Sequence, residues 1–325
     1  MAQPLLQVRN LTTRFKTERG RLTAVDQVSL DVESGETVAI VGESGSGKSV
    51  TALSIMRLIP SPPGRIDSGE VIFEGRDLLK LDDAGIRAIR GNKIAMIFQE
   101  PMSSLNPALT VGMQVAEPVN LHRNVTWAKA LDHAKELLGR VRIPDAASRL
   151  ASYPHQYSGG MRQRVMIAMA LACQPRLIIA DEPTTALDVT VQAQILDLLK
   201  EITRETGSSL LLITHDLGIV ARYADRVAVM YGGRIVETAP ARELYKFPRH
   251  PYTQGLMASV PRLDGDVGRP LVPIDGQPPD LAQLPPGCSF SPRCRIATDP
   301  CRIAPPALVE IGDRHFKACF NDIRA

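Results

Sequence analysis

Residues 42–49 read GESGSGKS and fit the pattern G-x-x-x-x-G-K-[S/T]. The β-branched apolar run TVAIV (37–41) precedes them and indicates a buried strand, and SVTALSIMRLI (49–59) has the spacing of a helix packed on a sheet. Glycines let backbone N–H groups surround phosphate oxygens, and the N-terminus of the following helix carries about half a positive charge. The stretch therefore predicts a phosphate-binding loop, formed by Gly42, Glu43, Ser44, Gly45, Ser46, Gly47, Lys48 and Ser49.

Two side chains of this loop bring chemistry beyond the backbone. Lys48 adds a full positive charge for phosphate oxygens, and the Ser49 hydroxyl is a ligand for Mg²⁺. The flanking strand and helix are the context that this pattern requires. We therefore prefer a nucleotide site to a merely flexible glycine loop.

A second apolar run, LIIAD (177–181), ends in a carboxylate and is followed by another. Asp181 is expected to reach the Mg²⁺ shell, and Glu182 is expected to polarise the attacking water as the catalytic base. The alternative is two solvated acids at a turn. The phosphate loop makes that alternative the weaker one.

The order of elements along the chain indicates an α/β fold. Strand-like segments at 5–15 and 24–32 precede the phosphate loop, and helical texture with Pro-, Ser- and Asn-rich loops fills about 99–157. Beyond it, a helix at 158–173, the LIIAD strand, a further helix and SLLLITHD (209–216) alternate. Such alternation predicts a mostly parallel sheet with its functional groups at the carboxyl ends of the strands.

The bulk properties exclude several classes of protein. The chain has 325 residues, enough for one large and one smaller domain, and its formal charge of +3 comes from basic residues interleaved with acids. No basic patch is expected, which argues against a nucleic-acid partner. MAQPLLQVRN lacks the basic start and apolar core of a secretory signal, and no apolar run approaches the roughly 20 residues that cross a bilayer. We expect a reducing compartment, with another chain supplying any membrane span.

One further segment specifies the type of nucleotide machine. YSGGMRQR (157–164) precedes the LIIADE strand at the interval seen in ABC-type ATPases and resembles the LSGGQ sequence of that family. Tyr157 and Met161 depart from the usual letters, so the resemblance rests on Ser158, Gly159 and Gly160. These residues are implied to hold the γ-phosphate of an ATP bound by another cassette.

Four more residues stand where the ABC family places functional side chains, in the family's order. The resemblance implies that Phe15 stacks on adenine, that Gln99 contacts nucleotide and Mg²⁺, and that Asp188 lies in the D-loop beside the nucleotide. It also makes His215, after the third strand, a catalytic residue. A lone histidine after a strand is more often structural, and the presence of the other landmarks reverses that expectation.

The resemblance implies an architecture and a working cycle. Residues 1–245 are expected to form a P-loop NTPase core of the ABC type, with an N-terminal antiparallel β part and a helical subdomain at about 100–157. Residues 246–325 form a Pro- and Cys-rich C-terminal extension in which regular structure is not expected. In the family, two cassettes lie head to tail with ATP between one phosphate loop and the other's Ser-Gly-Gly segment. ATP and Mg²⁺ are therefore the expected cofactors.

Three segments indicate the branch of the family. QEPMSSLNP (99–107), DEPTTALDVT (181–190) and RHPYTQGLM (249–257) most resemble the ATPase subunits of dipeptide and oligopeptide importers. The implied partners are a second, paralogous ATPase subunit, two transmembrane permeases and an external binding protein, with this chain at the cytoplasmic face of the inner membrane. We expect ATP hydrolysis that powers peptide import. Import of nickel chelates or another small solute, a soluble ABC-type protein and an iron–sulfur regulatory ATPase are the alternatives.

The tail gathers four of the five cysteines, spaced C-x5-C-x6-C-x17-C from Cys288 through Cys294 and Cys301 to Cys319. Structural zinc sites normally contain C-x2–4-C pairs, which are absent, and four thiolates on longer loops fit an iron–sulfur cluster better. Zinc and free thiols remain alternatives on spacing alone. The resemblance favours a [4Fe-4S] cluster, because some peptide-importer ATPases carry one in such a tail. Cys173, on a predicted helix, is expected to be a core residue.

Overall fold

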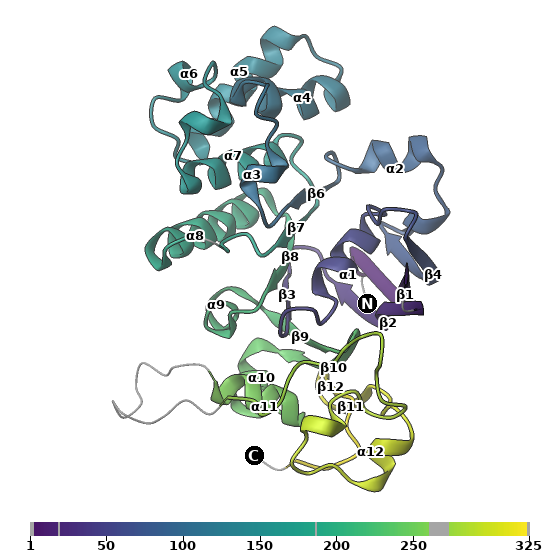
Figure 1. Cartoon of the computed structure of the whole chain (residues 1–325). Helices are drawn as coiled ribbons and strands as arrows, with labels where there is room; N and C mark the ends of the chain where they lie inside the picture. Colours follow the sequence, from purple (N-terminus) through teal and green to yellow (C-terminus); the bar gives the residue numbers. More distant parts are fainter. Residues whose placement is uncertain (1–2, 19, 186, 260–272, 324–325) are drawn as a thin grey trace. The chain divides into compact units, whose positions relative to one another are not determined.

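The computed structural model describes residues 3–18, 20–185, 187–259 and 273–323. The chain forms two compact units, and Figure 1 colours it by sequence from purple at the N-terminus to yellow at the C-terminus. The first unit comprises residues 1–32, 37–79 and 213–325, and the second comprises 33–36 and 80–212.

The first unit contains a four-stranded antiparallel sheet, as its alternating sequence predicts. The strand order is β2-β1-β4-β5. The strands are β1 (Leu6–Thr17), β2 (Gly20–Val32), β4 (Gly64–Phe73) and β5 (Arg76–Asp77). β1 and β2 form a hairpin that pairs Leu6 with Val32 at one end and Thr17 with Gly20 at the other.

Five strands of the main sheet also belong to the first unit, in the order β11-β12-β10-β9-β3. They are β3 (Thr37–Val41), β9 (Arg226–Tyr231), β10 (Arg234–Pro240), β11 (Val309–Gly312) and β12 (His315–Lys317). β3 and β9 are parallel, whereas β9, β10, β12 and β11 follow one another antiparallel. The main sheet is therefore mixed, because the chain adds hairpins to its parallel part.

Helix α1 (Lys48–Ile55) follows β3 and ends earlier than its sequence predicts. Arg57 adopts a left-handed backbone conformation with φ of 52°. The N–H of Leu58 then bonds back to the carbonyl of Leu53, which closes the helix in a Schellman-type turn. Residues 57–59, which were predicted to continue the helix, form this turn and the chain that leaves it.

The second unit carries the helical insertion and the remaining main-sheet strands. β6 (Ile94–Ile97) and β7 (Leu177–Asp181) pair in parallel, and β8 (Ser209–Thr214) lies next to β7. Figure 1 shows the teal helices α3 to α7 grouped together beyond β6. The helices of this unit are α2 (Asp83–Ile89), α3 (Pro101–Ser104), α4 (Val111–Arg123), α5 (Trp127–Arg140), α6 (Ala146–Arg149), η2 (Pro154–Gln156), α7 (Gly159–Leu171) and α8 (Val189–Thr206), and η1 (Leu78–Lys80) precedes them in the sequence.

Helix α5 shows why the insertion folds as its sequence predicts. The Thr126 hydroxyl caps the helix by accepting from the N–H of Lys129. Ala130, Ala134, Leu137 and Leu138 are buried and lie on one face at helical spacing. That face packs against α4 and α7 within the same unit.

The C-terminal region contains more regular structure than its prolines led us to expect. It includes α11 (Pro251–Ala258), η3 (Ser291–Arg293), α12 (Asp299–Ile303), β11 and β12, and it is preceded by α9 (Leu217–Tyr223) and α10 (Ala241–Lys246). Pro251 and Pro300 lie in the first turns of their helices, where no intrahelical N–H is needed. The expectation of irregular structure is wrong around Pro251 and Pro300, because these prolines begin helices instead of breaking them, whereas residues 273–290 contain no helix or strand.

The core of the first unit joins this region to the cassette strands. Val41, Val229 and Val236 from three strands form one buried cluster with Tyr252 and Phe290 from the C-terminal region. The rings of Tyr231, Tyr252 and Phe290 pack on one another with centroid distances of 4.4 to 5.4 Å. Among the residues that the structure describes, no helix combines the length and apolar character needed to span a membrane.

We predict that Phe290→Ala lowers the free energy of unfolding by about 3–5 kcal/mol, because it removes a buried aromatic ring and leaves a cavity. Phe290 is 4% exposed, whereas Phe247 is 42% exposed. Phe247→Ala is therefore the matched control, with an expected loss of about 0.5 kcal/mol. Urea denaturation followed by circular dichroism measures both, and equal losses would show that the C-terminal region does not share the core.

Candidate functional site

The loop at 42–49 is packed so closely that two of its glycines have no room for a side chain. A Cβ on Gly42 would lie 2.2 Å from the carbonyl oxygen of Met230, and one on Gly47 would lie 2.3 Å from that of Ala24. Gly47 also has a φ of 105°, which L side chains rarely adopt. β3, β9 and β2 therefore determine the path of the loop from outside, and α1 begins directly after Gly47.

Lys48 and Ser46 point their polar groups into this compact loop. The Nζ atom of Lys48, a residue only 4% exposed, donates to the carbonyls of Gly42 at 2.8 Å and Glu43 at 3.0 Å. The buried Ser46 Oγ has no hydrogen-bond partner among the described atoms. Such an orphaned hydroxyl fits a site that binds a phosphate oxygen. Ser44 and Gly45 are exposed at the tip, and Ser49 is half-buried in the first turn of α1.

Glu43 is contacted by two residues for which the sequence predicted no role. Its N–H donates to the Tyr252 hydroxyl at 2.8 Å, and its carboxylate accepts from the Arg293 guanidinium at 2.7 and 3.1 Å. Burial raises the pKa of Tyr252 above its ordinary value, so its phenol stays neutral. The RHPYTQGLM segment resembles the family, but nothing in it indicates a contact with residue 43.

In the second unit, Asp181 and Glu182 lie at the end of β7, as predicted for the carboxylate pair. Asp181 is buried, and Glu182 is half-buried with a φ of 45°, an uncommon conformation for a residue with a long side chain. One Glu182 carboxylate oxygen accepts from Gln99 Nε2 at 3.2 Å and from Thr185 Oγ1 at 2.9 Å. The structure thus brings together Gln99 and Glu182, which lie 83 positions apart. Thr185 was not predicted.

The segments after Tyr157 and around Asp188 both begin helices of the second unit. The Ser158 hydroxyl accepts from the N–H of Met161 and caps α7, so Gly159 and Gly160 form its first turn. The Asp188 carboxylate accepts from the N–H of Val191 at 2.9 Å and caps α8. Ser158 and Gly159 are exposed, so this helix N-terminus is open to a ligand from outside.

Two further predicted residues lie on or directly after other strands. Phe15 lies on β1, half-buried, and packs its ring against Gly64 of the neighbouring strand β4. His215 is exposed and directly follows β8, at the carboxyl end of the strand. Both belong to the first unit with the phosphate loop, whereas Gln99, Asp181 and Glu182 belong to the second.

The four tail cysteines converge, although they are spread over 32 positions of the sequence. Cys288, Cys294, Cys301 and Cys319 line one small cavity beside His250 and Phe290, and all are free thiols. Burial raises the pKa of Cys288 to about 11 and also raises those of Cys294 and Cys319. Within the described residues, no group of three or more His, Cys, Asp or Glu side chains could hold a metal ion.

Cys173 behaves differently from the tail thiols. It is 1% exposed, and its thiol donates to the Pro118 carbonyl at 3.3 Å within the second unit. Burial raises its pKa, which is expected of an inert core residue. The prediction that Cys173 is a packing residue is confirmed.

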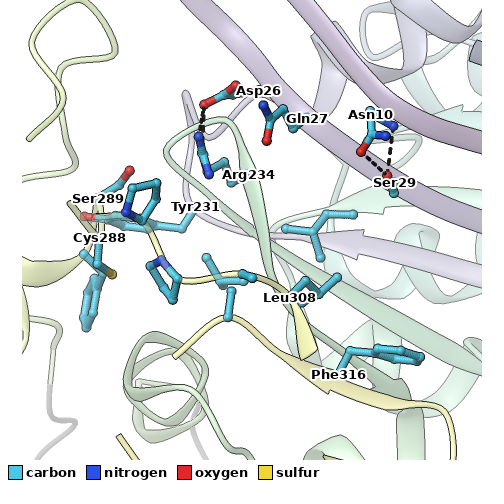
Figure 2. Close-up of a pocket in the computed structure, with 17 residues that line it drawn as sticks. Asn10, Asp26, Gln27, Ser29, Tyr231, Arg234, Cys288, Ser289, Leu308 and Phe316 are labelled. Carbon is cyan, nitrogen blue, oxygen red and sulfur yellow. Dashed lines mark hydrogen bonds and ion pairs between the residues drawn. The ribbon is translucent and has the colours of Figure 1, made fainter. Parts of the chain in front are cut away.

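A larger cavity of about 410 Å³ lies between β2, β10 and the C-terminal region, and its described lining includes none of the predicted nucleotide residues. Figure 2 shows its polar edge, where Asp26 pairs with Arg234 at 2.6 Å and Asn10 bonds Ser29. Cys288, Leu308 and Phe316 line the rest, among other apolar side chains. Of the described residues that the sequence predicted as site residues, Cys288 is the one that lines both this cavity and the cysteine cavity.

Comparison with known proteins agrees with these features. Residues 25–185 match the family model "ABC transporter", and residues 236–301 match "Oligopeptide/dipeptide transporter, C-terminal region". The chain is 51% identical to the dipeptide transport ATP-binding protein DppD of Bacillus subtilis, over 99% of this chain and 96% of that protein. It is 52% identical to the oligopeptide transport ATP-binding protein OppD of Haemophilus influenzae, over 93% of each chain.

The solved structures extend the likeness to three dimensions. A dimeric ATP-binding cassette in a post-hydrolysis state with ADP and Pi is 31% identical, with a TM-score of 0.66 over 73% of this chain and 99% of that one. The matches of the cassette and of the C-terminal region thus both point to transporter ATP-binding proteins. The chain belongs to the ABC transporter family, among the ATP-binding proteins of the dipeptide and oligopeptide transporters.

Proposed function

We propose that this chain hydrolyses ATP to power peptide import, as the names of its dipeptide and oligopeptide transport relatives suggest. The observation that carries the proposal is the arrangement of Glu182 at the end of β7. Its carboxylate accepts hydrogen bonds from Gln99 and Thr185, and the residue directly follows the buried Asp181. This orientation suits the proposed general base for the attacking water.

The phosphate loop supplies the binding energy for the nucleotide. Lys48 Nζ, which bonds two loop carbonyls, provides positive charge for phosphate oxygens, and the orphaned Ser46 hydroxyl provides a further polar contact. Ser49, Asp181 and Gln99 are the proposed Mg²⁺ ligands, since hydroxyl, carboxylate and amide oxygens suit this hard cation. Bound Mg²⁺ neutralises charge that develops on the phosphates.

Catalysis in this proposal depends on side-chain orientation. Gln99 and Thr185 both donate to one Glu182 oxygen, and these two bonds orient the carboxylate that accepts a proton from water. His215, exposed at the end of β8, is proposed as the second catalytic side chain, and Phe15 as the adenine-stacking ring.

A pair of cassettes completes the proposed site. The exposed N-terminus of α7, capped by Ser158, would receive the γ-phosphate of an ATP bound to the partner's phosphate loop. Asp188, which follows β7 closely in the sequence, is proposed to lie beside the nucleotide. Two solved structures of a cassette that is 31–32% identical to this chain are dimeric. A paralogous ATPase, two permeases and an external binding protein are the proposed partners, and this chain is proposed to lie at the cytoplasmic face of the inner membrane. Residues 1–245 are the proposed cassette, and residues 246–325 are its extension.

Glu182→Gln tests the catalytic assignment. We expect ATP binding to persist while the turnover number falls by about 100-fold or more, because the amide cannot accept the proton from water. With Mg²⁺-ATP and the partner cassette, the variant should accumulate as a closed dimer. Phosphate release and size-exclusion chromatography with light scattering measure the two effects.

Glu205→Gln is the matched control, because Glu205 is a surface carboxylate of the same unit that pairs with Arg140 at 2.7 Å. It should hydrolyse ATP at the rate of the natural protein. Normal turnover by Glu182→Gln would remove Glu182 as the base, and rapid hydrolysis by a strictly monomeric protein would remove the two-cassette scheme.

The cysteine cavity is proposed to hold a [4Fe-4S] cluster. The family resemblance favours an iron–sulfur cluster over a single zinc ion, and the four cysteines lack the C-x2–4-C pairs of structural zinc sites. A cluster instead spreads four thiolates around a body several ångströms across. Four thiols lining one cavity fit that demand, with cluster binding displacing the thiol protons despite the raised pKa values of Cys288, Cys294 and Cys319. Its proposed role is to tie together loops that have few apolar side chains.

Substituting serine at Cys288, Cys294, Cys301 or Cys319 should abolish iron and sulfide in anaerobically purified protein, together with its brown absorbance. Cys173→Ala is the control and should retain both, because Cys173 lies in the core of the other unit. Iron and sulfide analysis with visible spectroscopy measures the outcome. A full iron content in all four serine variants would contradict this set of ligands.

A further inference from the structure

Glu43, the second residue of the phosphate loop, has a partner for its backbone N–H, its backbone carbonyl and its carboxylate. Its N–H donates to the Tyr252 hydroxyl, its carbonyl accepts from Lys48 Nζ, and its carboxylate pairs with Arg293. Two of these three partners belong to the C-terminal region, more than 200 positions along the chain. A loop residue next to the phosphate-binding glycine thus takes its position from the tail.

Arg293 is built for this contact. Its side chain is 6% exposed, and its guanidinium lies 5.9 Å from the ring centre of Tyr231 and 6.0 Å from that of Phe290. It also donates to the carbonyls of Asp275 and Ile274 at 2.9 and 3.3 Å. These rings and carbonyls fix the orientation of the guanidinium group. It therefore presents two nitrogens to the Glu43 carboxylate in the bidentate geometry that suits arginine.

Moving Glu43 would disturb the centre of the loop. The Glu43 carbonyl accepts both from Lys48 Nζ and from the N–H of Ser46, so its place affects the lysine and the serine that face the phosphates. Gly42, just before it, has no space to adjust against Met230. A shift at Glu43 therefore passes to Lys48 and Ser46 and cannot be absorbed on the strand side.

We infer that Arg293 is a positioning residue of the ATP site, and that the C-terminal region sets ATP affinity by holding Glu43 in place. The inference rests on the proposed ATP site and does not depend on what the cysteines bind. The turn that carries Arg293 ends at Cys294, which lines the cysteine cavity. The same turn thus links the thiol region to the phosphate loop.

The test is equilibrium binding of a fluorescent ATP analogue to the full-length chain. Arg293→Met, Glu43→Gln and Tyr252→Phe should each weaken binding by about tenfold, a common size for coupling between two groups. The double variant Arg293→Met with Glu43→Gln should bind no more weakly than the worse of the two single variants, because both remove the same contact.

Arg295→Met is the matched control. Arg295 lies two positions away in the same segment, but its side chain is 73% exposed and pairs with Asp275, which is 67% exposed. The ATP affinity of the Arg295→Met variant should match that of the natural protein. Lys48→Met should abolish binding, so retention of binding by that variant would contradict the ATP site itself and not only the role of Arg293.

Several results would overturn the inference. One is an ATP affinity of Glu43→Gln equal to that of the natural protein. Another is tighter ATP binding by Glu43→Gln together with a return to the natural affinity in the double variant, since Arg293 would then merely neutralise the charge of Glu43. A lower thermal midpoint without any loss of ATP affinity would show that the pair only attaches the tail to the cassette. If Arg293→Met does not fold, Glu43→Gln and Tyr252→Phe decide the question on their own.

Discussion

The backbone carbonyls of Met230 and Ala24 leave no space for a Cβ at Gly42 or Gly47, and this close packing fixes the phosphate loop between β3 and α1. Because the loop cannot relax toward β9 or β2, its lysine and serine point inward, where Lys48 bonds two loop carbonyls and the Ser46 hydroxyl is left without a described partner. A rigid loop of this kind binds phosphate with its groups already in place, which reduces the entropy cost of binding.

The second unit contributes a different kind of preorganisation. Glu182 adopts a left-handed backbone conformation that is unfavourable for its residue type, and side-chain bonds from Gln99 and Thr185 accompany it. Strained residues of this kind occur where the surroundings over-determine a position and a function requires it. Phosphate-binding groups and the proposed base thus belong to separate compact units.

The C-terminal region is part of the first unit's core. β12 pairs with β10, Phe290 packs among the buried rings, and the Glu237 carboxylate accepts from His315 at 2.8 Å and from two backbone N–H groups. A fully buried carboxylate with three donors is well satisfied and resists displacement. This anchoring gives Arg293 and Tyr252 a firm base from which to contact Glu43.

The sequence by itself determined the features that depend on neighbours along the chain. The glycine pattern, the apolar strand before it and the terminal carboxylates of LIIADE predicted the loop, β3 and β7, and apolar spacing predicted α5, because backbone conformation and helical periodicity are local properties. The tertiary structure decided what depends on distant partners: the bond between Gln99 and Glu182, the shared cavity of the four cysteines, and the contact of Arg293 with Glu43, 250 positions away. Pro251 was misread for the same reason, because whether a proline breaks or begins a helix depends on the surroundings against which that helix packs.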